Sequence, residues 1–214
     1  MVYALGKHGE SIKINFSPRI HQDVMHPILR KLEGGNRRSI GRSNEVVTDV
    51  IANPMFFEAV FSGLQSDNAV LRARAADAVE KITVRHPEYL RPYKAKLIGR
   101  LARLDQKEVR WHVAQMLPRI QWNQSERQQV LDILMRYLND ESSIVKAFTM
   151  QALADLAEQA PELRPTVLLH LRELTAIGTP AMKARGRKLL AKFGALTRRS
   201  TGRAKKRCSR DLRR

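Results

Sequence analysis

A pattern of twelve residues that recurs four times constrains this chain more than any other feature of its sequence. The copies begin at Leu71, Val109, Val145 and Met182, so successive starts are 38, 36 and 37 residues apart. Each copy has an apolar residue followed by a basic one, a mostly small or apolar sixth position, and apolar ninth and twelfth positions. Such a period is typical of solenoids, in which each unit buries its apolar face only against its neighbours. The ninth and twelfth positions, which we expect to be buried, are Val79, Leu117, Leu153 and Leu190, and Ile82, Ile120, Leu156 and Phe193.

Each copy follows another segment with helical spacing, so each unit is expected to be a hairpin of two helices. In the first unit, four apolar residues fall on one stripe of the preceding helix, which predicts a buried face. They are Phe57, Val60, Phe61 and Leu64. The corresponding segments of the later units begin near Glu88, Ser125 and Pro161.

Local signals predict where several of these helices begin and end. The run from Ser125 to Gln128 has the pattern of a capping box, which marks a helix start. Pro118 lies inside the second copy, where a proline deletes a hydrogen bond and is expected to kink or end the helix. Gly194 predicts the end of the last helix.

The N-terminal part of the chain precedes the repeats. Residues 1–17 show no helical period, so we expect a poorly ordered lead-in. Residues 18–53 predict a helical cap. In this cap, helical spacing from Pro18 to Leu32 indicates one helix, and residues 45–52 indicate another.

The loop over residues 34–44 joins the two helices of this cap and contains glycines and three arginines. Ser43 is expected to cap the helix that follows. Free backbone amides, arginine side chains and a helix N-terminus together make phosphate sites in other proteins, so the loop is a candidate anion-binding site. The alternative is a solvated connector whose arginines pair with neighbouring acids. The candidate residues are Arg37, Arg38 and Arg42.

The net charge of +18 is concentrated at the ends of the chain. Residues 1–42 carry +5, residues 43–175 carry zero, and residues 176–214 carry +13. Residues 195–214 contain 9 basic residues and one acid with little apolar content, so this tail is expected to be disordered on its own. It could attract nucleic acid or an acidic membrane surface without specificity, or it could keep the protein in solution. The candidate residues of the tail are Arg198, Arg199, Arg203, Lys205, Lys206 and Arg207.

The second position of every copy is basic, and in three units an acid lies in the turn before it. We expect ion pairs between turn and helix that hold successive units in register. The alternative is a stripe of positive charge for nucleic acid, which the built-in acids would oppose. The basic residues are Arg72, Arg110, Lys146 and Lys183, and the acids of the first three units are Asp67, Asp105, and Asp140 or Glu141.

Residues 54–194 resemble HEAT repeats. The resemblance lies in the apolar-basic helix start after an acidic turn, the small sixth position, and the Pro-Glu pairs that begin at Pro87 and Pro161. It implies an all-α fold, a right-handed α-solenoid of about four helical hairpins, here with an N-terminal helical cap and a basic C-terminal tail. It also implies a platform that binds proteins or, less often, nucleic acid.

Three hypotheses for function follow. The first is a non-enzymatic scaffold that offers its inner helices to a protein partner. The alternative is a nucleic-acid-binding module that uses the basic C-terminal end and the concave face. The third is a DNA glycosylase: such enzymes of this fold carry a tryptophan and a catalytic aspartate one helical turn later, but Trp111 is followed by Gln115, whose amide supplies no negative charge. The candidate residues of the concave face are Arg74, Arg110, Trp111, His112, Lys146, Arg185 and Lys188.

Other classes of function lack a matching pattern. The sequence contains no metal-ligand spacing and no nucleotide-binding motif, so we expect no cofactor. Its single cysteine, Cys208, excludes a disulfide within the chain. No apolar run approaches membrane-spanning length and the opening residues do not resemble a secretory signal, so we expect a cytoplasmic protein.

Overall fold

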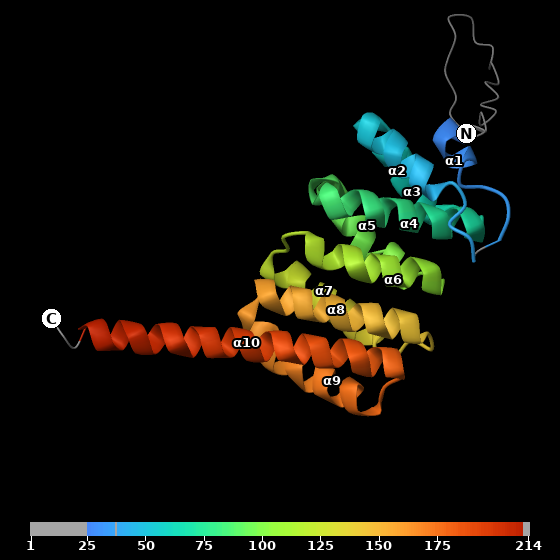
Figure 1. Cartoon of the computed structure of the whole chain (residues 1–214). Helices are drawn as coiled ribbons and strands as arrows, with labels where there is room; N and C mark the ends of the chain where they lie inside the picture. The colour runs from blue at the N-terminus through green and yellow to red at the C-terminus, as the bar shows by residue number, and fades with distance from the viewer. Residues whose placement is uncertain (1–24, 37, 212–214) are drawn as a thin grey trace, which may run out of the picture.

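The computed structural model describes residues 25–36 and 38–211, with side chains as far as Ala195. In this part of the chain every regular element is a helix, and the helices stack in one curved array (Figure 1). The predicted all-α solenoid is therefore confirmed. The predicted lead-in at residues 1–17 lies outside the described residues.

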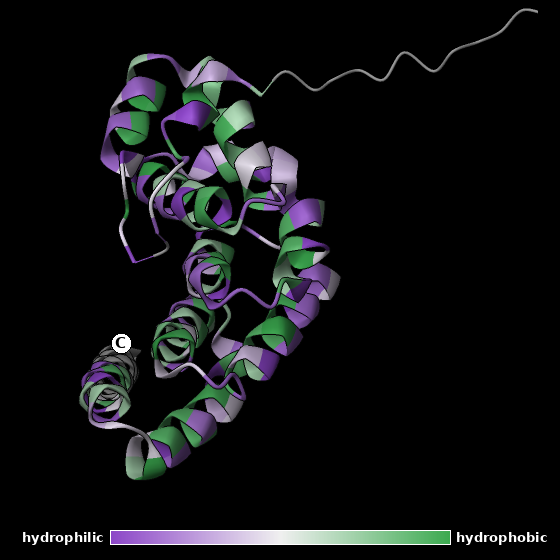
Figure 2. Cartoon of the chain, turned by 90° about the vertical axis from the view of Figure 1, so that its right-hand side faces the viewer, coloured by the Kyte–Doolittle hydropathy of each residue, from purple (hydrophilic) through white to green (hydrophobic). Residues whose placement is uncertain are grey.

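The inner layer of the array consists of four helices that contain the copies of the repeated pattern, except that the last four residues of the second copy follow the end of its α-helix. Each of them packs on the next one along the chain. In Figure 2 the stack is seen from its side as an arc of two layers that is open toward the inner helices. The inner helices are α4 (Ala69–Arg85), α6 (Lys107–Met116), α8 (Ser143–Gln159) and α10 (Pro180–Asp211).

The outer layer contains the helix that precedes each copy. These helices are α3 (Phe57–Ser62), α5 (Lys94–Ile98), α7 (Gln124–Tyr137) and α9 (Arg164–Ile177). Proline and glycine interrupt the first two, so 3-10 turns extend them and tighter hydrogen bonding replaces part of the α-helix. The 3-10 segments of the outer layer are η1 (Pro54–Phe56), η2 (Gly63–Gln65), η3 (Pro87–Tyr93), η4 (Leu101–Arg103) and η6 (Pro161–Leu163).

The N-terminal cap differs from the prediction. Among the described residues its first helix is only α1 (Pro27–Arg30), followed by α2 (Ser43–Ala52). His26 has an extended backbone with φ −56° and ψ 133°, because the ring of a following proline disfavours helical geometry in the preceding residue. The predicted continuous helix from Pro18 to Leu32 is therefore wrong at Pro27.

Two predicted helix caps are also wrong. Ser43 does not cap α2, because its hydroxyl donates to Asp77 of α4 at 2.5 Å instead. The capping box of α7 is formed by Asn123 with Glu126, not by Ser125. The Ser43 hydroxyl is bound by a carboxylate that lies near it in space. At α7 the side-chain amide of Asn123, two residues before Ser125, accepts from the helix N-terminus instead.

The core contains the positions that the repeat predicts. The ninth and twelfth residues of the copies are buried, except Leu190, which is half-buried against the core. The predicted stripe of α3 is buried too, and Phe61 stacks on Tyr93 of the next unit with 3.9 Å between ring centroids. Aromatic packing thus joins the first two outer segments.

Two predicted helix ends have opposite outcomes. The α-helix α6 ends at Met116 and continues as the 3-10 turn η5 (Leu117–Arg119), so the break at Pro118 is confirmed. The helix α10 continues past Gly194 as far as Asp211. A glycine inside a helix costs only about 1 kcal/mol, so it does not by itself end a helix among good helix formers. The disorder of the basic tail stays a prediction.

The close approach of α9 and α10 yields a testable prediction. Gly186 of α10 is buried, and a Cβ at this position would overlap Oγ1 of Thr175 and lie 3.0 Å from Cε of Met150. We expect Gly186→Ala to lower the free energy of unfolding by about 1–3 kcal/mol in urea denaturation, because the added methyl group separates the two helices.

The matched control is Gly194→Ala, in the same helix, where a Cβ would meet nothing within 4 Å. Alanine favours the helix there, so this variant should be unchanged or stabilised by up to about 1 kcal/mol. Equal stability of the two variants would contradict the close packing of α9 on α10.

Candidate functional site

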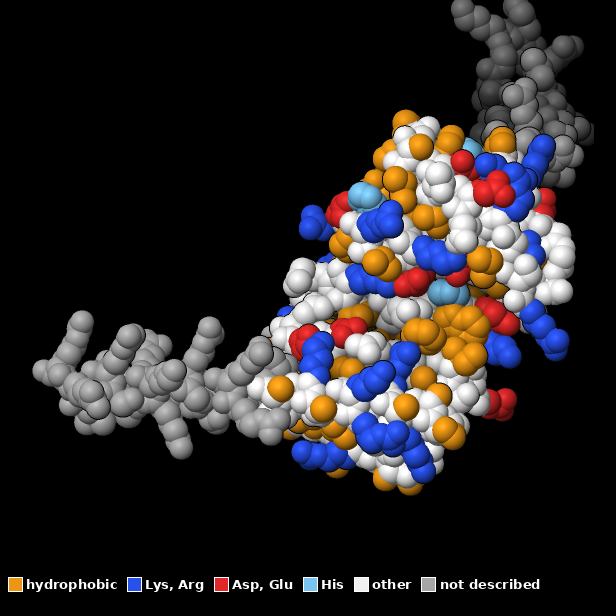
Figure 3. All heavy atoms as spheres, viewed as in Figure 1, with side chains coloured by type: hydrophobic (Ala, Val, Ile, Leu, Met, Phe, Trp, Pro, Cys, Tyr) orange, Lys and Arg blue, Asp and Glu red, His pale blue; other side chains and the backbone are white. Residues whose placement is uncertain are grey.

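The concave side of the arc contains a cavity of about 580 Å³ between three inner helices and the loop after α1. Its walls come from α4, α6 and α8, and residues 38–40 of the loop complete them. Figure 3 looks onto this side and shows apolar side chains gathered beside a histidine. The lining residues are Arg38, Ser39, Ile40, Ala73, Arg74, Asp77, Lys107, Glu108, Trp111, His112, Ile144 and Phe148.

Arg74 of α4 holds this loop in place. The residue is only 5% exposed, and its guanidinium donates hydrogen bonds to four backbone carbonyls that precede or belong to the loop. These carbonyl dipoles compensate the buried positive charge. The acceptors are the carbonyls of Leu32 at 3.1 Å, Glu33 at 2.9 Å, Asn36 at 3.4 Å and Ser39 at 3.1 Å.

Two glycines allow the loop to wrap around Arg74. Gly35 and Gly41 have φ of 70° and 54°, in the left-handed region that favours glycine. A Cβ on Gly41 would lie 2.5 Å from Cζ of Arg74. Arg74, which the sequence predicts as a ligand-binding residue of the concave face, is therefore turned into the protein and saturated by its own loop.

The predicted anion-binding arginines of this loop lie in different surroundings. Arg37 is outside the described residues, and Arg38 is exposed at the cavity. Arg42 donates to the carboxylate of Glu45 at 2.7–3.0 Å, and this hydrogen bond raises the pKa of Arg42 and lowers the pKa of Glu45. Pairing of an arginine with a neighbouring acid is expected for a solvated connector. Anion binding by the loop stays a prediction.

His112 of α6 lies in the cavity wall and is held in one tautomer. Its Nε2 accepts a hydrogen bond from the indole N–H of Trp111 at 3.0 Å, so the hydrogen must be on Nδ1, which donates to the backbone carbonyl of Glu108 at 2.6 Å. His112 is 8% exposed, and burial lowers its pKa. The ring is thus a neutral structural group with both nitrogens in use.

Asp77 of α4 also lines the cavity, and its carboxylate is well supplied with donors. It accepts from Oγ of Ser43 at 2.5 Å and from Nζ of Lys81 at 2.7 Å, and Oδ1 lies 3.8 Å from Nε2 of His112. These contacts connect α2, α4 and α6 behind the cavity.

Glu108 of α6 lines the same cavity but has no such support. The residue is 8% exposed, and its Oε2 has no hydrogen-bond partner in the described part of the chain. A buried polar atom without a partner is uncommon in folded proteins, since its desolvation is not compensated.

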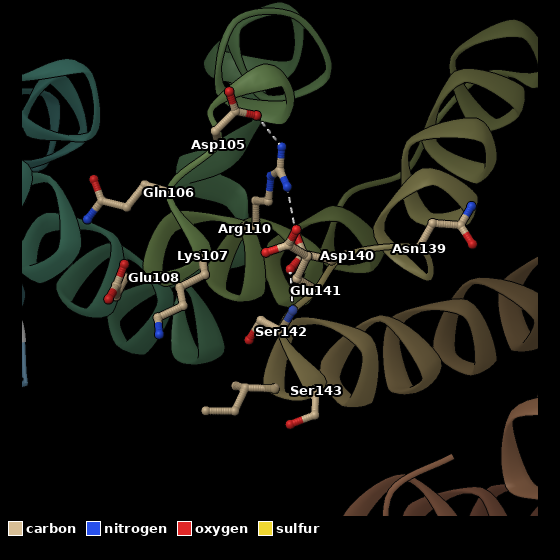
Figure 4. A pocket seen from close by; sticks show the side chains of 11 residues that line it. Asp105, Gln106, Lys107, Glu108, Arg110, Asn139, Asp140, Glu141, Ser142 and Ser143 are labelled. Atoms are coloured by element: carbon tan, nitrogen blue, oxygen red, sulfur yellow. Dashed lines mark hydrogen bonds and ion pairs between the residues drawn. The ribbon is translucent and has the colours of Figure 1, made fainter. Parts of the chain in front are cut away.

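Arg110 of α6 forms the predicted ion pair and a second one. Its guanidinium reaches Asp105 in the preceding turn at 2.5 Å and Asp140 in the turn of the next unit at 2.6 Å (Figure 4). It also donates to the carbonyl of Leu104 at 2.8 Å and lies over the ring of Tyr137. Arg110, predicted as a residue of the concave face, therefore joins two turns beside a further cavity of about 870 Å³.

The other second-position residues differ from Arg110. Arg72 donates to Oε1 of Gln106 in the next turn at 2.8 Å and to the carbonyl of Ser66 at 2.6 Å, so the predicted pair with Asp67 is wrong. An amide of the next unit is the better-placed acceptor. The half-buried side chain of Lys146 makes no hydrogen bond or ion pair within the described residues, so its predicted pair with Asp140 or Glu141 is wrong, and Asp140 pairs with Arg110 instead.

The remaining candidates of the concave face do not point outward together. Arg185 of α10 lies 4.7 Å from the ring of Phe148 and donates to the carbonyl of Ala147 at 3.2 Å. Lys188 is exposed. With Arg74 and His112 buried, the structure does not bring the positive and titratable candidates together on one surface. The side chains of the basic tail lie outside the described residues.

The glycosylase hypothesis gains no support from the geometry around Trp111. Gln115, one turn after Trp111, donates its amide to the carbonyl of Trp111 at 3.2 Å. Within the described residues no group of three or more His, Cys, Asp or Glu side chains could hold a metal ion. A helix long and apolar enough to cross a membrane is also not found in this part of the chain.

Several lining residues were missed from sequence, although the repeat contains a signal for them. The fourth position of each copy is one such signal, and these positions are Arg74, His112, Phe148 and Arg185. The residue just before each copy, such as Glu108 or Ile144, lies four residues earlier and therefore on the same helical face. All these named residues except Arg185 line the cavity. Aligning the copies by the variable positions, rather than by the apolar ones, would have indicated Glu108, Ile144 and Phe148.

Comparisons with known proteins agree with the geometry. Residues 29–193 match a family model described as a HEAT repeat domain. Neither a search of curated proteins nor one of solved structures finds a match.

The role of Arg74 can be tested by Arg74→Met, which keeps an extended side chain but leaves the loop carbonyls without their donor. We expect the free energy of unfolding to fall by about 2–4 kcal/mol and hydrogen exchange to accelerate in residues 38–41. Arg85→Met, at the exposed end of the same helix, should change stability by less than about 0.5 kcal/mol. Equal effects of the two substitutions would contradict the organising role of Arg74.

The burial of His112 predicts a pH dependence of stability. Its folded-state pKa is lowered, so the unfolded state binds the proton more readily and stability falls as the pH drops below the unfolded pKa of about 6.5. The loss ends below the folded-state pKa. Denaturation of the wild type and of His112→Gln between about pH 8 and about pH 5 isolates this contribution. We expect the advantage of the wild type to shrink toward low pH, and a constant difference would contradict a neutral buried ring.

Proposed function

Because the chain belongs to the HEAT repeat domain family, whose model it matches over residues 29–193, we propose that it is a non-enzymatic scaffold that binds a protein partner on the concave face of its inner helices. Stacked helical repeats form extended concave surfaces that are commonly used for binding. The family supports the scaffold role in general. The choice of face and of a protein as partner is our addition.

The observation that carries this proposal is the apolar surface around the 580 Å³ cavity. Ile40 on the loop and Ile144 on α8 are 45% and 46% exposed. Trp111 and Phe148 are half-buried beside the same cavity. Large apolar and aromatic side chains that line one hollow are typical of protein-binding sites, since covering them removes apolar surface from water.

The charges at this face favour a protein over nucleic acid. Phosphates would approach Asp77 and Glu108, whereas Arg74 is engaged with the loop and His112 is neutral. Binding of nucleic acid depends on cations that face the backbone phosphates. Arg38 and Lys107 are the exposed cations among the lining residues, and they face the same hollow as these two carboxylates.

The proposal can be tested by selecting displayed random peptides of about twelve residues on the full chain and measuring their affinity for variants. We expect Ile144→Asp to weaken selected peptides at least about tenfold, because a charge in the apolar contact must be desolvated. Leu169→Asp is the matched control, since Leu169 is 62% exposed on the outer helix α9. Peptides that tolerate Ile144→Asp, or a selection that yields no concave-face binder, would count against the proposal.

A second candidate function is nonspecific binding of nucleic acid by the C-terminal end. Figure 3 shows Lys and Arg side chains concentrated where α9 and α10 lie. Lys192 pairs with Glu158, but Arg187 and Lys188 are exposed. The +13 charge of residues 176–214 adds to this end of the molecule.

Titration with labelled DNA and RNA over a salt series separates the two candidate functions. We expect binding by the full chain that weakens steeply with salt and is lost from a chain that ends at Gly194, because counterion release by the tail supplies the affinity. Affinity that survives the truncation and falls on Trp111→Ala would instead favour a nucleic-acid site on the concave face.

A further inference from the structure

Glu108 differs from the buried Arg74 and the half-buried Asp77, which also line the concave cavity. Arg74 donates to loop carbonyls, and Asp77 accepts from Ser43 and Lys81. Glu108 is also largely withdrawn from water, with 8% of its surface exposed. Its Oε2, however, has no donor among the described residues. In Figure 4 no dashed line reaches its carboxylate, although the nearby Arg110 is paired with two acids.

The position of Glu108 makes its carboxylate reachable from a binding surface. It lines the cavity of about 580 Å³, a neighbouring one of about 440 Å³ beside the loop, and the one of about 870 Å³ at the turns. Glu108 is therefore at the junction of three hollows rather than inside the apolar core. A group that enters any of them lies beside Glu108, and since Oε2 itself has almost no exposed surface, rotation of the Glu108 side chain has to turn this oxygen toward the group.

A carboxylate in this position favours a cationic donor as its missing partner. Burying a carboxylate without a hydrogen bond costs free energy. This cost is compensated when a charged donor is buried beside the carboxylate and hydrogen-bonds to it. Arg38 and Lys107 also line these hollows, but both are exposed, so their charges remain solvated. The described part of the chain thus leaves the acceptor open.

The walls of the main cavity suit a long side chain with a flat cation at its end. Ile40 and Ile144 can cover the aliphatic stem, and Trp111 and Phe148 offer aromatic faces. A guanidinium binds a carboxylate through two parallel hydrogen bonds and loses less hydration than an ammonium. Arginine therefore matches the site better than lysine.

We propose that Glu108 recognises an arginine side chain of the protein partner. The arginine enters the concave cavity together with apolar side chains that flank it in the partner. This inference rests on the proposed function, since it concerns the same face, and it adds the chemical class of the residue that is recognised. On this inference, the preference of the site for a charged side chain over a neutral one of the same shape comes from Glu108.

The test uses the full chain and two short peptides, acetyl-Leu-Arg-Leu-amide and the same peptide with citrulline, the neutral isostere of arginine. Trp111 and Trp122 are the only tryptophans. NMR titration can therefore follow the indole N–H of Trp111 in the cavity, with the indole of Trp122, which donates to the carbonyl of Leu117 at 2.7 Å, as an internal reference.

We expect the arginine peptide to shift the Trp111 signal and to bind at least about tenfold more tightly than the citrulline peptide, as for a hydrogen bond between charged groups. Glu108→Gln should abolish this preference. Glu58→Gln, which removes an exposed carboxylate of α3, should retain it. Equal affinities, a preference that survives Glu108→Gln, or no shift of Trp111 with either peptide would overturn the inference.

These outcomes are distinguishable from failure of the proposed function. If selected peptides bind the concave face but show no dependence on arginine or Glu108, only the inference fails. If no peptide binds this face, the proposed function fails as well.

Thermal unfolding supplies an independent measurement. Because Glu108 has no donor in the free protein, Glu108→Gln should leave the Tm unchanged or raise it, as for other residues that serve binding at the expense of stability. A fall of several degrees would show that the carboxylate is a structural partner and would overturn its assignment as a free acceptor.

Discussion

Stacking of the inner helices is the constraint on which the rest of the structure depends. A single hairpin cannot cover the apolar face of its own inner helix, so residues such as Val79 and Leu117 are fully withdrawn from water only because the adjoining units lie against them. Small residues at the contacts, including Ala76 and Gly186, let the helices approach. The position of every surface feature, including the concave cavity, follows from this stacking.

Hydrophobic burial has little directional preference, and polar contacts between units supply the register. Arg110 links the turn of its own unit to Asp140 of the next. Arg72 makes the same kind of connection to Gln106, and Arg119 reaches back to Glu80 and Thr83. Each of these bonds spans two units, so it adds to stability only when the units are correctly stacked.

The concave face combines equivalent positions with different chemistry. Arg74 and His112 have the same place in their repeats, yet one is saturated by a loop and the other is fixed as a neutral ring. Phe148, in the next repeat, adds apolar surface. Beside them Glu108 remains without a donor. Repeat stacking thus leaves, within an otherwise apolar hollow, one acceptor that the described part of the chain does not satisfy, and the proposed recognition of arginine depends on it.

The sequence by itself determined the helices, their pairing into units and the buried ninth and twelfth positions, because these follow from local periodicity. It also predicted the break at Pro118, since a missing N–H acts within its own helix. Only the tertiary structure decided that Arg74 is enclosed by a loop some forty residues earlier, and that Glu108 is buried without a partner. Hydrogen bonds between distant segments depend on distances that periodicity does not encode, and whether a polar group is satisfied depends on those distances.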